Sequence, residues 1–191
     1  SKLYSLLDQF ALGGKQEQKQ KLAQKILTQS EKEFNAKDDC DKELAFKFLN
    51  STGKSSFLTA LTKTEDHNRW SEVVFKAIQK SNYSLNDMFE QRVKEIGNQT
   101  LFMDMSKEMP MHWTYTQVKL HVREIAAVFY RYGKKEPRVA VYSENSVEGA
   151  SCDLACLFYD IFDTPLNVHF NKEQLLTIFD QLEINIAVAD T

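Results

Sequence analysis

A strand that runs into a polar turn gives the clearest fold signal in this chain, and it is the segment Arg138-Val139-Ala140-Val141-Tyr142-Ser143-Glu144-Asn145-Ser146. Its apolar first half, with alternating valines, predicts a strand over Arg138–Tyr142. Asn145 and Ser146 are residue types that favour helix N-caps, so a helix is expected to follow at Val147. Strand, turn and helix in this order indicate an α/β unit.

The residues that follow repeat this alternation. The expected elements are a helix over Val147–Phe162, a strand over Asp163–Val168, a helix over Lys172–Leu182 capped by Asn171, and a strand over Ile184–Ala189. Helical connections between strands of one sheet are right-handed and make the strands parallel. The sequence therefore predicts a three-stranded parallel sheet covered by helices on both faces.

The residues before Arg138 are expected to add further α/β elements. Ser84 precedes an amphipathic helix that stops at Gly97, and Thr100–Met105 and His112–Tyr115 look like extended segments. Thr116 is expected to cap a long helix that reaches Gly133.

Residues 1–80 differ in composition, because they contain no proline, only three glycines, and many Lys, Gln, Glu, Ala and Leu residues. This composition is typical of helices. The expected helices are Leu3–Ala11, Gln16–Gln29, Lys42–Leu49, Ser56–Leu61 and Asn68–Gln79. Their apolar stripes are narrow, so each helix needs a partner surface. We predict a helical extension over residues 1–80, docked on another surface, and an α/β unit over residues 81–191.

Composition and charge exclude several classes of protein. The 191 residues are 42% hydrophobic, and no apolar run approaches the length of a transmembrane helix. Residues 1–80 carry a formal charge of +3 and residues 81–191 a charge of −6, so nucleic acid is not an expected partner. Three cysteines do not form a disulfide framework, which favours a reducing, cytoplasmic location.

Two motifs suggest chemistry but have simpler explanations. Gly53-Lys54-Ser55 matches the end of a phosphate-binding loop, yet Phe48 replaces the earlier glycine and the preceding residues look helical, which favours a turn and a helix start. Cys152 and Cys156 share one helix face, but no histidine has matching metal-ligand spacing, so two buried thiols are the better interpretation.

Two residues are candidates for substrate binding because of where the predicted strands end. Ligands of open parallel sheets lie beyond the carboxyl ends of the strands. Asn145 follows the strand Arg138–Tyr142, and His169 follows the strand Asp163–Val168. A helix cap at Asn145 and a solvent-exposed loop at His169 are the alternatives. The sequence suggests no catalytic residue and no metal site.

Several signatures occur in the order found in one family. Thr114-Tyr115-Thr116-Gln117-Val118 resembles the Thr-Tyr-x-Glu-Leu signature of the adenylate-forming superfamily. Pro137–Ser146 resembles its Gly-Asp-x-Val-Ala-Ile-x-x-Glu-Asn-Ser segment, and Leu154–Asn167 is similar to its Ala-x-x-Ala-Gly-x-x-x-x-Pro-Leu-Asn stretch. An Ala-Val-x-Asp-like strand, 187–190, follows. The departures are Gln117 for Glu, Glu136-Pro137 for Gly-Asp, and Asp160 near the Ala-Gly pair.

The resemblance covers about Leu85–Thr191 and implies the N-terminal portion of an AMP-binding enzyme, closest to fatty acyl-CoA synthetases. Such enzymes use ATP, Mg²⁺ and coenzyme A to convert a carboxylic acid to an acyl-adenylate and then to an acyl-CoA. The Lys-containing phosphate loop, the ribose-binding acid and the lid lysine of the family have no match here. The resemblance thus implies an α/β domain that is truncated before the phosphate loop, needs the rest of its adenylation domain, and is inactive and cofactor-free alone. A non-catalytic interaction module is the alternative.

Overall fold

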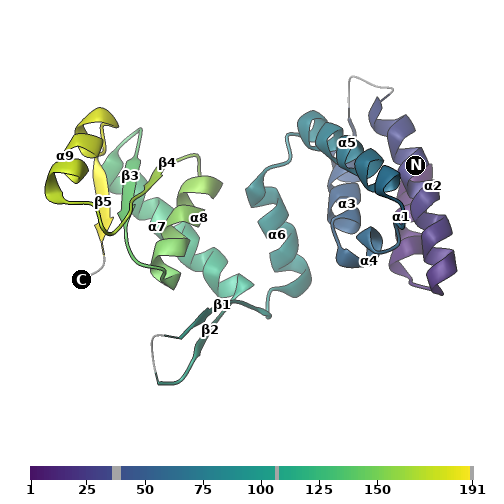
Figure 1. Cartoon of the computed structure of the whole chain (residues 1–191), viewed down its shortest axis with the longest axis horizontal. Helices are drawn as coiled ribbons and strands as arrows, with labels where there is room; N and C mark the ends of the chain where they lie inside the picture. The colour runs from purple at the N-terminus through teal and green to yellow at the C-terminus, as the bar shows by residue number, and fades with distance from the viewer. Residues whose placement is uncertain (36–39, 106–107, 190–191) are drawn as a thin grey trace. The chain divides into compact units, whose positions relative to one another are not determined.

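The computed structural model describes residues 1–35, 40–105 and 108–189, and the chain divides into two compact units, Ser1–Ser84 and Leu85–Thr191. The first unit is helical (Figure 1). Its elements are α1 (Lys2–Ala11), α2 (Gln16–Asn35), α3 (Lys42–Thr52), α4 (Ser55–Leu58) and α5 (Thr64–Ser81). No helix in the described residues is long and apolar enough to cross a bilayer.

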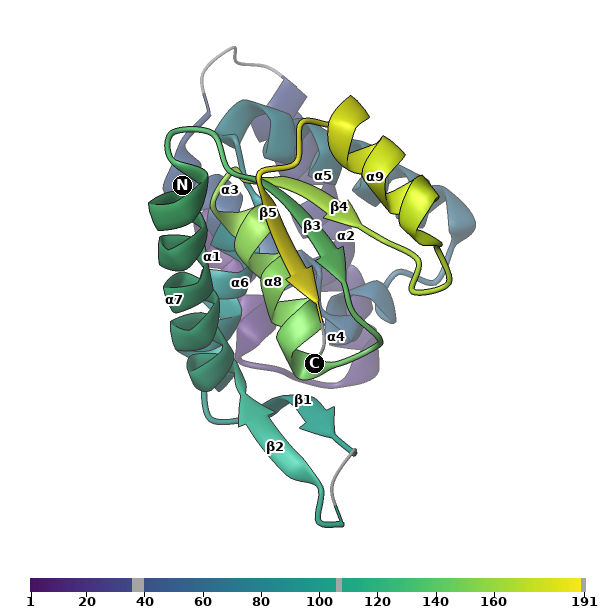
Figure 2. The same cartoon turned by 90° about the vertical axis from the view of Figure 1, so that its left-hand side faces the viewer.

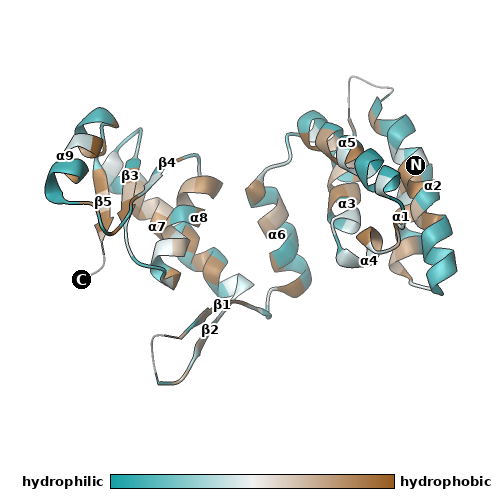
Figure 3. Cartoon of the chain, in the orientation of Figure 1, coloured by the Kyte–Doolittle hydropathy of each residue, from teal (hydrophilic) through white to brown (hydrophobic). Residues whose placement is uncertain are grey.

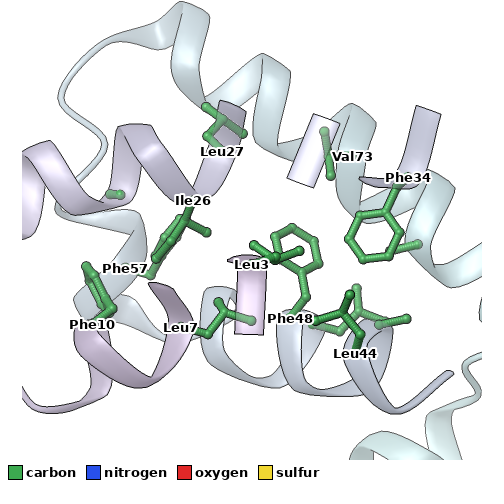
Figure 4. Close-up of a cluster of buried hydrophobic side chains, with 14 of the residues drawn as sticks. Leu3, Leu7, Phe10, Ile26, Leu27, Phe34, Leu44, Phe48, Phe57 and Val73 are labelled. Carbon is green, nitrogen blue, oxygen red and sulfur yellow. The ribbon is translucent and has the colours of Figure 1, made fainter. Parts of the chain in front are cut away.

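The helices of the first unit bury their apolar stripes against one another. Figure 4 shows side chains from all five helices meeting in one cluster, among them Leu3, Ile26, Phe48, Phe57 and Val73. The fully buried rings of Phe34 and Phe48 lie 5.2 Å apart between centroids. The partner surface that the narrow stripes require is therefore supplied within residues 1–84.

One ionic network joins α2 to α5 at the edge of this core. Arg69 donates from Nε and Nη2 to the two carboxylate oxygens of Glu31, at 2.7 and 2.8 Å. Its Nη1 donates to Asp66 at 3.2 Å, and the Gln24 amide donates to the other oxygen of Asp66 at 2.6 Å. The hydrogen bond from Arg69 lowers the pKa of Glu31. Asp66 is only 5% exposed, so these partners satisfy a charge that burial would otherwise destabilise.

The second unit contains a parallel sheet, as the sequence predicts. Its elements are α6 (Leu85–Ile96), β1 (Thr100–Asp104), β2 (Met111–Thr114), α7 (Tyr115–Gly133), β3 (Arg138–Tyr142), α8 (Val147–Phe158), β4 (Phe162–Pro165), α9 (Lys172–Gln181) and β5 (Ile186–Ala189). The strand order is β4-β3-β5, and β3 is parallel to both neighbours. Strands β1 and β2 form a separate antiparallel hairpin. The predicted α/β fold class is confirmed.

Helices lie on both sides of the parallel sheet (Figures 1 and 2), but they cover it unequally. Val139 and Val141 of β3 pack into a cluster with Val122 of α7 and Cys152 and Ala155 of α8. Helix α9 lies on the opposite side and buries none of its residues. The core of this unit is therefore concentrated between α7, α8 and the strands.

Several predicted boundaries differ from the structure, among them that of the strand expected over Asp163–Val168, which spans Phe162–Pro165. Two other differences have identifiable reasons. The helix expected over Val147–Phe162 ends at Phe158, because Asp160 adopts a left-handed conformation with φ of 55° and the chain then enters β4. Helix α7 is capped by Thr114 and not by Thr116: Thr114 and Gln117 form a reciprocal capping box. Asn171 caps α9 as predicted, with Gln174 as its partner.

Candidate functional site

The turn after β3 is held rigidly against the start of α8. The Ser146 hydroxyl accepts a hydrogen bond from the Gly149 amide at 2.9 Å and lies 3.1 Å from the Ser143 hydroxyl. A Cβ at Gly149 would lie 3.0 Å from Ser143 Oγ, so the glycine allows this close approach. The turn therefore presents Asn145 as an exposed side chain on a fixed backbone.

The loop after β4 is tied to the same sheet edge. The Tyr142 hydroxyl at the end of β3 donates to the Val168 carbonyl at 2.5 Å. The Asn167 side chain accepts a hydrogen bond from the His169 amide at 2.9 Å, which fixes the next residue in a local turn. His169 is exposed, and its position follows from contacts to its backbone.

The structure places both candidate substrate-binding residues around one hollow. Asn145 and His169 line a cavity of about 470 Å³ together with Leu166 and Asn167. Both loops lie at the carboxyl ends of parallel strands, where the topology predicts a ligand. Substrate binding by these two residues stays a prediction.

A second hollow of about 580 Å³ shares the β3–α8 turn, including Asn145. One wall is apolar and comes from Phe102 and Met103 of β1, and another is polar and includes Asp153 of α8. Neither this cavity nor the one beside His169 is lined by a described lysine or arginine. Phosphate groups would need cations from other residues.

Two carboxyl groups beneath this edge have unusual surroundings. The Oδ1 atoms of Asp153 and Asp163 are buried and have no hydrogen-bond partner in the described residues. Burial, followed by the nearby charge of Asp153, raises the pKa of Asp163 to about 6. Burial also raises the pKa of Asp153. Asp163 is thus uncharged in part of the molecules near neutral pH.

The cysteines of α8 are buried, in agreement with the sequence prediction. Cys152 is 6% exposed and Cys156 is 1% exposed. Burial raises the pKa of Cys152 to about 11 and that of Cys156 to about 12. Because the thiolate is the reactive form of cysteine, both side chains are poor nucleophiles at neutral pH.

The remaining sequence motifs form neither a phosphate-binding loop nor a metal site in the described residues. Gly53 is the C-cap of α3 and Lys54 precedes the four-residue α4, so no strand leads into this segment and the turn interpretation is confirmed. Over residues 1–35, 40–105 and 108–189, no three His, Cys, Asp or Glu side chains come together as possible metal ligands. Asp190, which completes the Ala-Val-x-Asp pattern, lies outside the described residues.

A comparison with models of protein families identifies the family to which the second unit is related. The model of the family described as "AMP-binding enzyme" matches residues 89–191, more than half of the chain. This chain belongs to the AMP-binding enzyme family. The match includes the whole parallel sheet and the loops that carry Asn145 and His169, so both hollows lie in the family-related region.

Solved structures with a TM-score of 0.50 support the fold. The inhibitor-bound N-terminal domain of FACL13 from Mycobacterium tuberculosis is 20% identical, with a TM-score of 0.50 over 56% of this chain and 26% of that chain. A second crystal form of that domain gives the same identity and TM-score, with 27% of that chain covered. A fatty acid AMP ligase from Legionella pneumophila is 22% identical over 56% of this chain and 19% of that chain, with a TM-score of 0.49.

This AMP-binding family member spans about a quarter or less of the length of those solved chains. No curated protein matches it. The likeness to the two FACL13 structures, at 20% identity, supports the architecture of the second unit, which is a small parallel sheet with flanking helices.

The sequence analysis did not single out Asp153, which lines the larger hollow, or Asp163, which lies near the start of β4. A weak signal exists, because Asp153 lies seven residues after the cap Ser146 and so falls on nearly the same face of α8. Nothing in the local sequence indicates that β4 brings Asp163 beside this helix. Their proximity depends on the register of the sheet.

Proposed function

We propose that the chain is the N-terminal part of an ATP-dependent acid–thiol ligase that acts on a medium- or long-chain fatty acid and transfers the acyl group to coenzyme A. The family match over residues 89–191 carries this proposal. The resemblance of the Glu-Asn-Ser and Pro-Leu-Asn segments to those of fatty acyl-CoA ligases supports a fatty acyl substrate. The hollows at the carboxyl edge of the sheet supply space for a ligand.

In the proposed reaction, a carboxylate oxygen attacks the α-phosphorus of ATP, and the bond to pyrophosphate breaks. The thiol of coenzyme A then attacks the acyl carbonyl, and AMP leaves. Asn145 and His169 are suited to hydrogen-bond the carboxylate or carbonyl oxygen of the acid, because a side-chain amide and an imidazole ring can each donate an N–H.

The described residues do not fit a resident Mg²⁺ or a phosphate cradle. Among the described residues, no lysine or arginine lines either hollow, and no three side chains come together as candidate metal ligands. Catalysis of phosphoryl transfer depends mainly on positioning and charge neutralisation. We therefore propose that residues 81–191 are the first part of an adenylation domain, preceded by a helical extension over residues 1–80. We further propose that these 191 residues are inactive without the rest of that domain.

Pyrophosphate exchange into ATP tests this assignment. The parent protein and the 191-residue chain are each assayed with a panel of carboxylic acids. Exchange that depends on the acid and occurs only in the parent protein is the expected result. Absence of exchange in both proteins would contradict the ligase assignment and favour the interaction module. Exchange catalysed by the isolated 191-residue chain would contradict its predicted inactivity.

Two substitutions test the substrate-binding residues in the parent protein. Asn145→Ala and His169→Ala are each expected to raise KM for the acid by about three- to tenfold, since each removes one hydrogen bond to the substrate. His112→Ala in β2 removes a histidine that lines neither hollow and serves as the control. An unchanged KM in both variants would contradict the proposed roles of Asn145 and His169. The ligase assignment is tested separately by the exchange assay.

A further inference from the structure

The outward face of α7 is unusually apolar for a helix at the surface. Figure 2 shows α7 beside α8 along one side of the second unit, and its inner face packs into the core there. Among the described helices, α7 has the most exposed large apolar side chains, which are Leu120, Val128, Tyr130 and Tyr132, at 45%, 49%, 42% and 67% exposure. In Figure 3, hydrophobic residues accordingly occur along much of α7. The outward side of a surface helix is ordinarily polar.

Five residues of α7 form one stripe on this outward face. Leu120, Glu124, Ala127, Val128 and Arg131 have the spacing i, i+4, i+7, i+8, i+11, so they share one side of the helix over about 16 Å of its axis. All five are exposed. The centre of this α7 stripe is apolar, and a carboxylate and a guanidinium group lie on either side of the centre.

The two charged residues of the α7 stripe make no ion pair within the described residues. By contrast, Lys119 of the same helix pairs with Glu90 at 2.6 Å. Glu124 and Arg131 are seven positions apart, about 10 Å along the axis, whereas side chains on a helix pair at three or four positions. The stripe therefore holds opposite charges that do not neutralise each other within one molecule.

The α7 stripe is complementary to itself when two copies lie antiparallel. Glu124 and Arg131 are equally far from the midpoint between Ala127 and Val128. A twofold axis through this midpoint places Glu124 of one copy level with Arg131 of the other, and it does so twice. The small side chain of Ala127 lets the two helices approach closely at the axis. A parallel arrangement would instead place like charges together.

We propose that a second copy of this chain docks on the α7 stripe and forms an antiparallel, twofold-symmetric dimer. Two Glu124–Arg131 ion pairs then flank an apolar centre of Ala127 and Val128, and Leu120 packs on the aliphatic stem of Arg131. One helix face is smaller than a standard protein interface, so the dimer dissociates at low concentration. This inference does not depend on the proposed function.

The charges of the α7 stripe disfavour two other classes of partner. A helix that lies on a membrane has a continuous apolar face, and here Glu124 and Arg131 interrupt it. Nucleic acid binds surfaces that carry an excess of cations, whereas this stripe has one carboxylate for its one guanidinium group. Equal and opposite charges placed symmetrically about an apolar centre fit a second copy of the same helix.

The test is sedimentation velocity of the parent protein and of the 191-residue chain over about 1–500 µM, a range suited to a weak interface. Both proteins are expected to sediment faster as the concentration rises. Glu124→Arg and Arg131→Glu each bring like charges together twice, and each should raise the dissociation constant of the dimer by about tenfold or more. A monomer at every concentration would overturn the proposal. A dimer of the short chain alone would also overturn it, because other parts of the parent protein would then cover the stripe.

Mixing the two charge-reversed proteins locates the contact. Glu124→Arg is positive at both ends of the stripe and Arg131→Glu is negative at both, so each variant complements the other but repels itself. An equimolar mixture should recover a dissociation constant within about threefold of the unsubstituted value, which also shows that both variants are folded.

A third charge reversal controls for general electrostatics. Glu173→Arg, at an exposed position on α9, should change the dissociation constant by less than about twofold. An equal loss in Glu173→Arg and Glu124→Arg would overturn the proposal. A mixture of the two stripe variants that stays monomeric would do the same and would place any dimer contact elsewhere.

Discussion

The two units of this chain build their cores in different ways. In residues 1–84, five short amphipathic helices surround one cluster in which Leu3, Ile26 and Phe48 are completely buried. In the second unit, the cluster lies between α7, α8 and β3, whereas α9 buries no residue and β5 alternates between exposed and half-buried positions. Stability is thus distributed around the whole first unit but is concentrated on one side of the sheet in the second.

The largest expected effect is the loss of a buried ring from the first unit. Phe48→Ala should lower the free energy of unfolding by about 3–5 kcal/mol, because it removes a fully buried side chain that packs against Phe34. The measurement is denaturant unfolding followed by far-ultraviolet circular dichroism. Phe75→Ala, at a position that is 60% exposed on α5, should cost less than about 0.5 kcal/mol. Similar losses in both variants would contradict the continuous core.

The second unit allows a comparison between the two sides of its sheet. Val139→Ala on β3 should cost about 2 kcal/mol, since Val139 is completely buried against the helices. Leu176→Ala on α9, where the side chain is 56% exposed, should change the unfolding free energy by less than about 0.5 kcal/mol. If Leu176→Ala costs as much as Val139→Ala, α9 is part of the core and the proposed asymmetry is wrong.

A pH dependence should distinguish the two units further. Folding raises the pKa of Asp163 from 3.8 to about 6. The folded chain therefore binds this proton more tightly than the unfolded chain does. The contribution of this proton to the free energy of unfolding is complete below about pH 4 and is lost as the pH rises through about 6. After allowance for solvent screening, the loss should be about 1–2 kcal/mol.

Asp163→Asn should abolish this part of the pH dependence of unfolding. Asp160→Asn, at an exposed position, is the matched control and should leave the curve as in the unsubstituted chain. Parallel curves for the unsubstituted chain and Asp163→Asn would show that Asp163 titrates normally.

The smallest effects concern two helix caps with the same geometry. Thr114→Ala removes the capping box of α7 and should cost about 1 kcal/mol in global stability, because α7 contributes Val118, Val122 and Phe129 to the core. Asn171→Ala removes the equivalent box of α9, and its cost should remain local. Amide hydrogen exchange should show faster opening of α9 with an unchanged midpoint of global unfolding. A lower midpoint would indicate that α9 is coupled to the sheet.

Much of the fold was accessible from local sequence. The alternating valines of Arg138–Tyr142 and the cap at Asn171 predicted elements that the structure contains. The end of α8 was missed because Phe158, Ile161 and Phe162 have the spacing of an apolar helix face, i, i+3, i+4. Asp160 adopts its left-handed conformation where the chain leaves α8 and enters β4.

The candidate site was only partly accessible. Strand order places the loops of Asn145 and His169 at one edge of the sheet, so their shared hollow follows from topology. The proximity of Asp153 to Asp163 could not be anticipated, because it combines the pitch of α8 with the register of β4.

The rate at which the two thiols on α8 react reports how fast the core of the second unit opens. Cys152 and Cys156 lie against the strands and ionise only at high pH, so an alkylating reagent can reach them only after this core has separated. Cys40, in the first unit, is half-buried and should be modified earlier. Counting the modified thiols over time by mass spectrometry would therefore give the rate at which the sheet core opens. The native cysteines serve as the probes, so no substitution is needed.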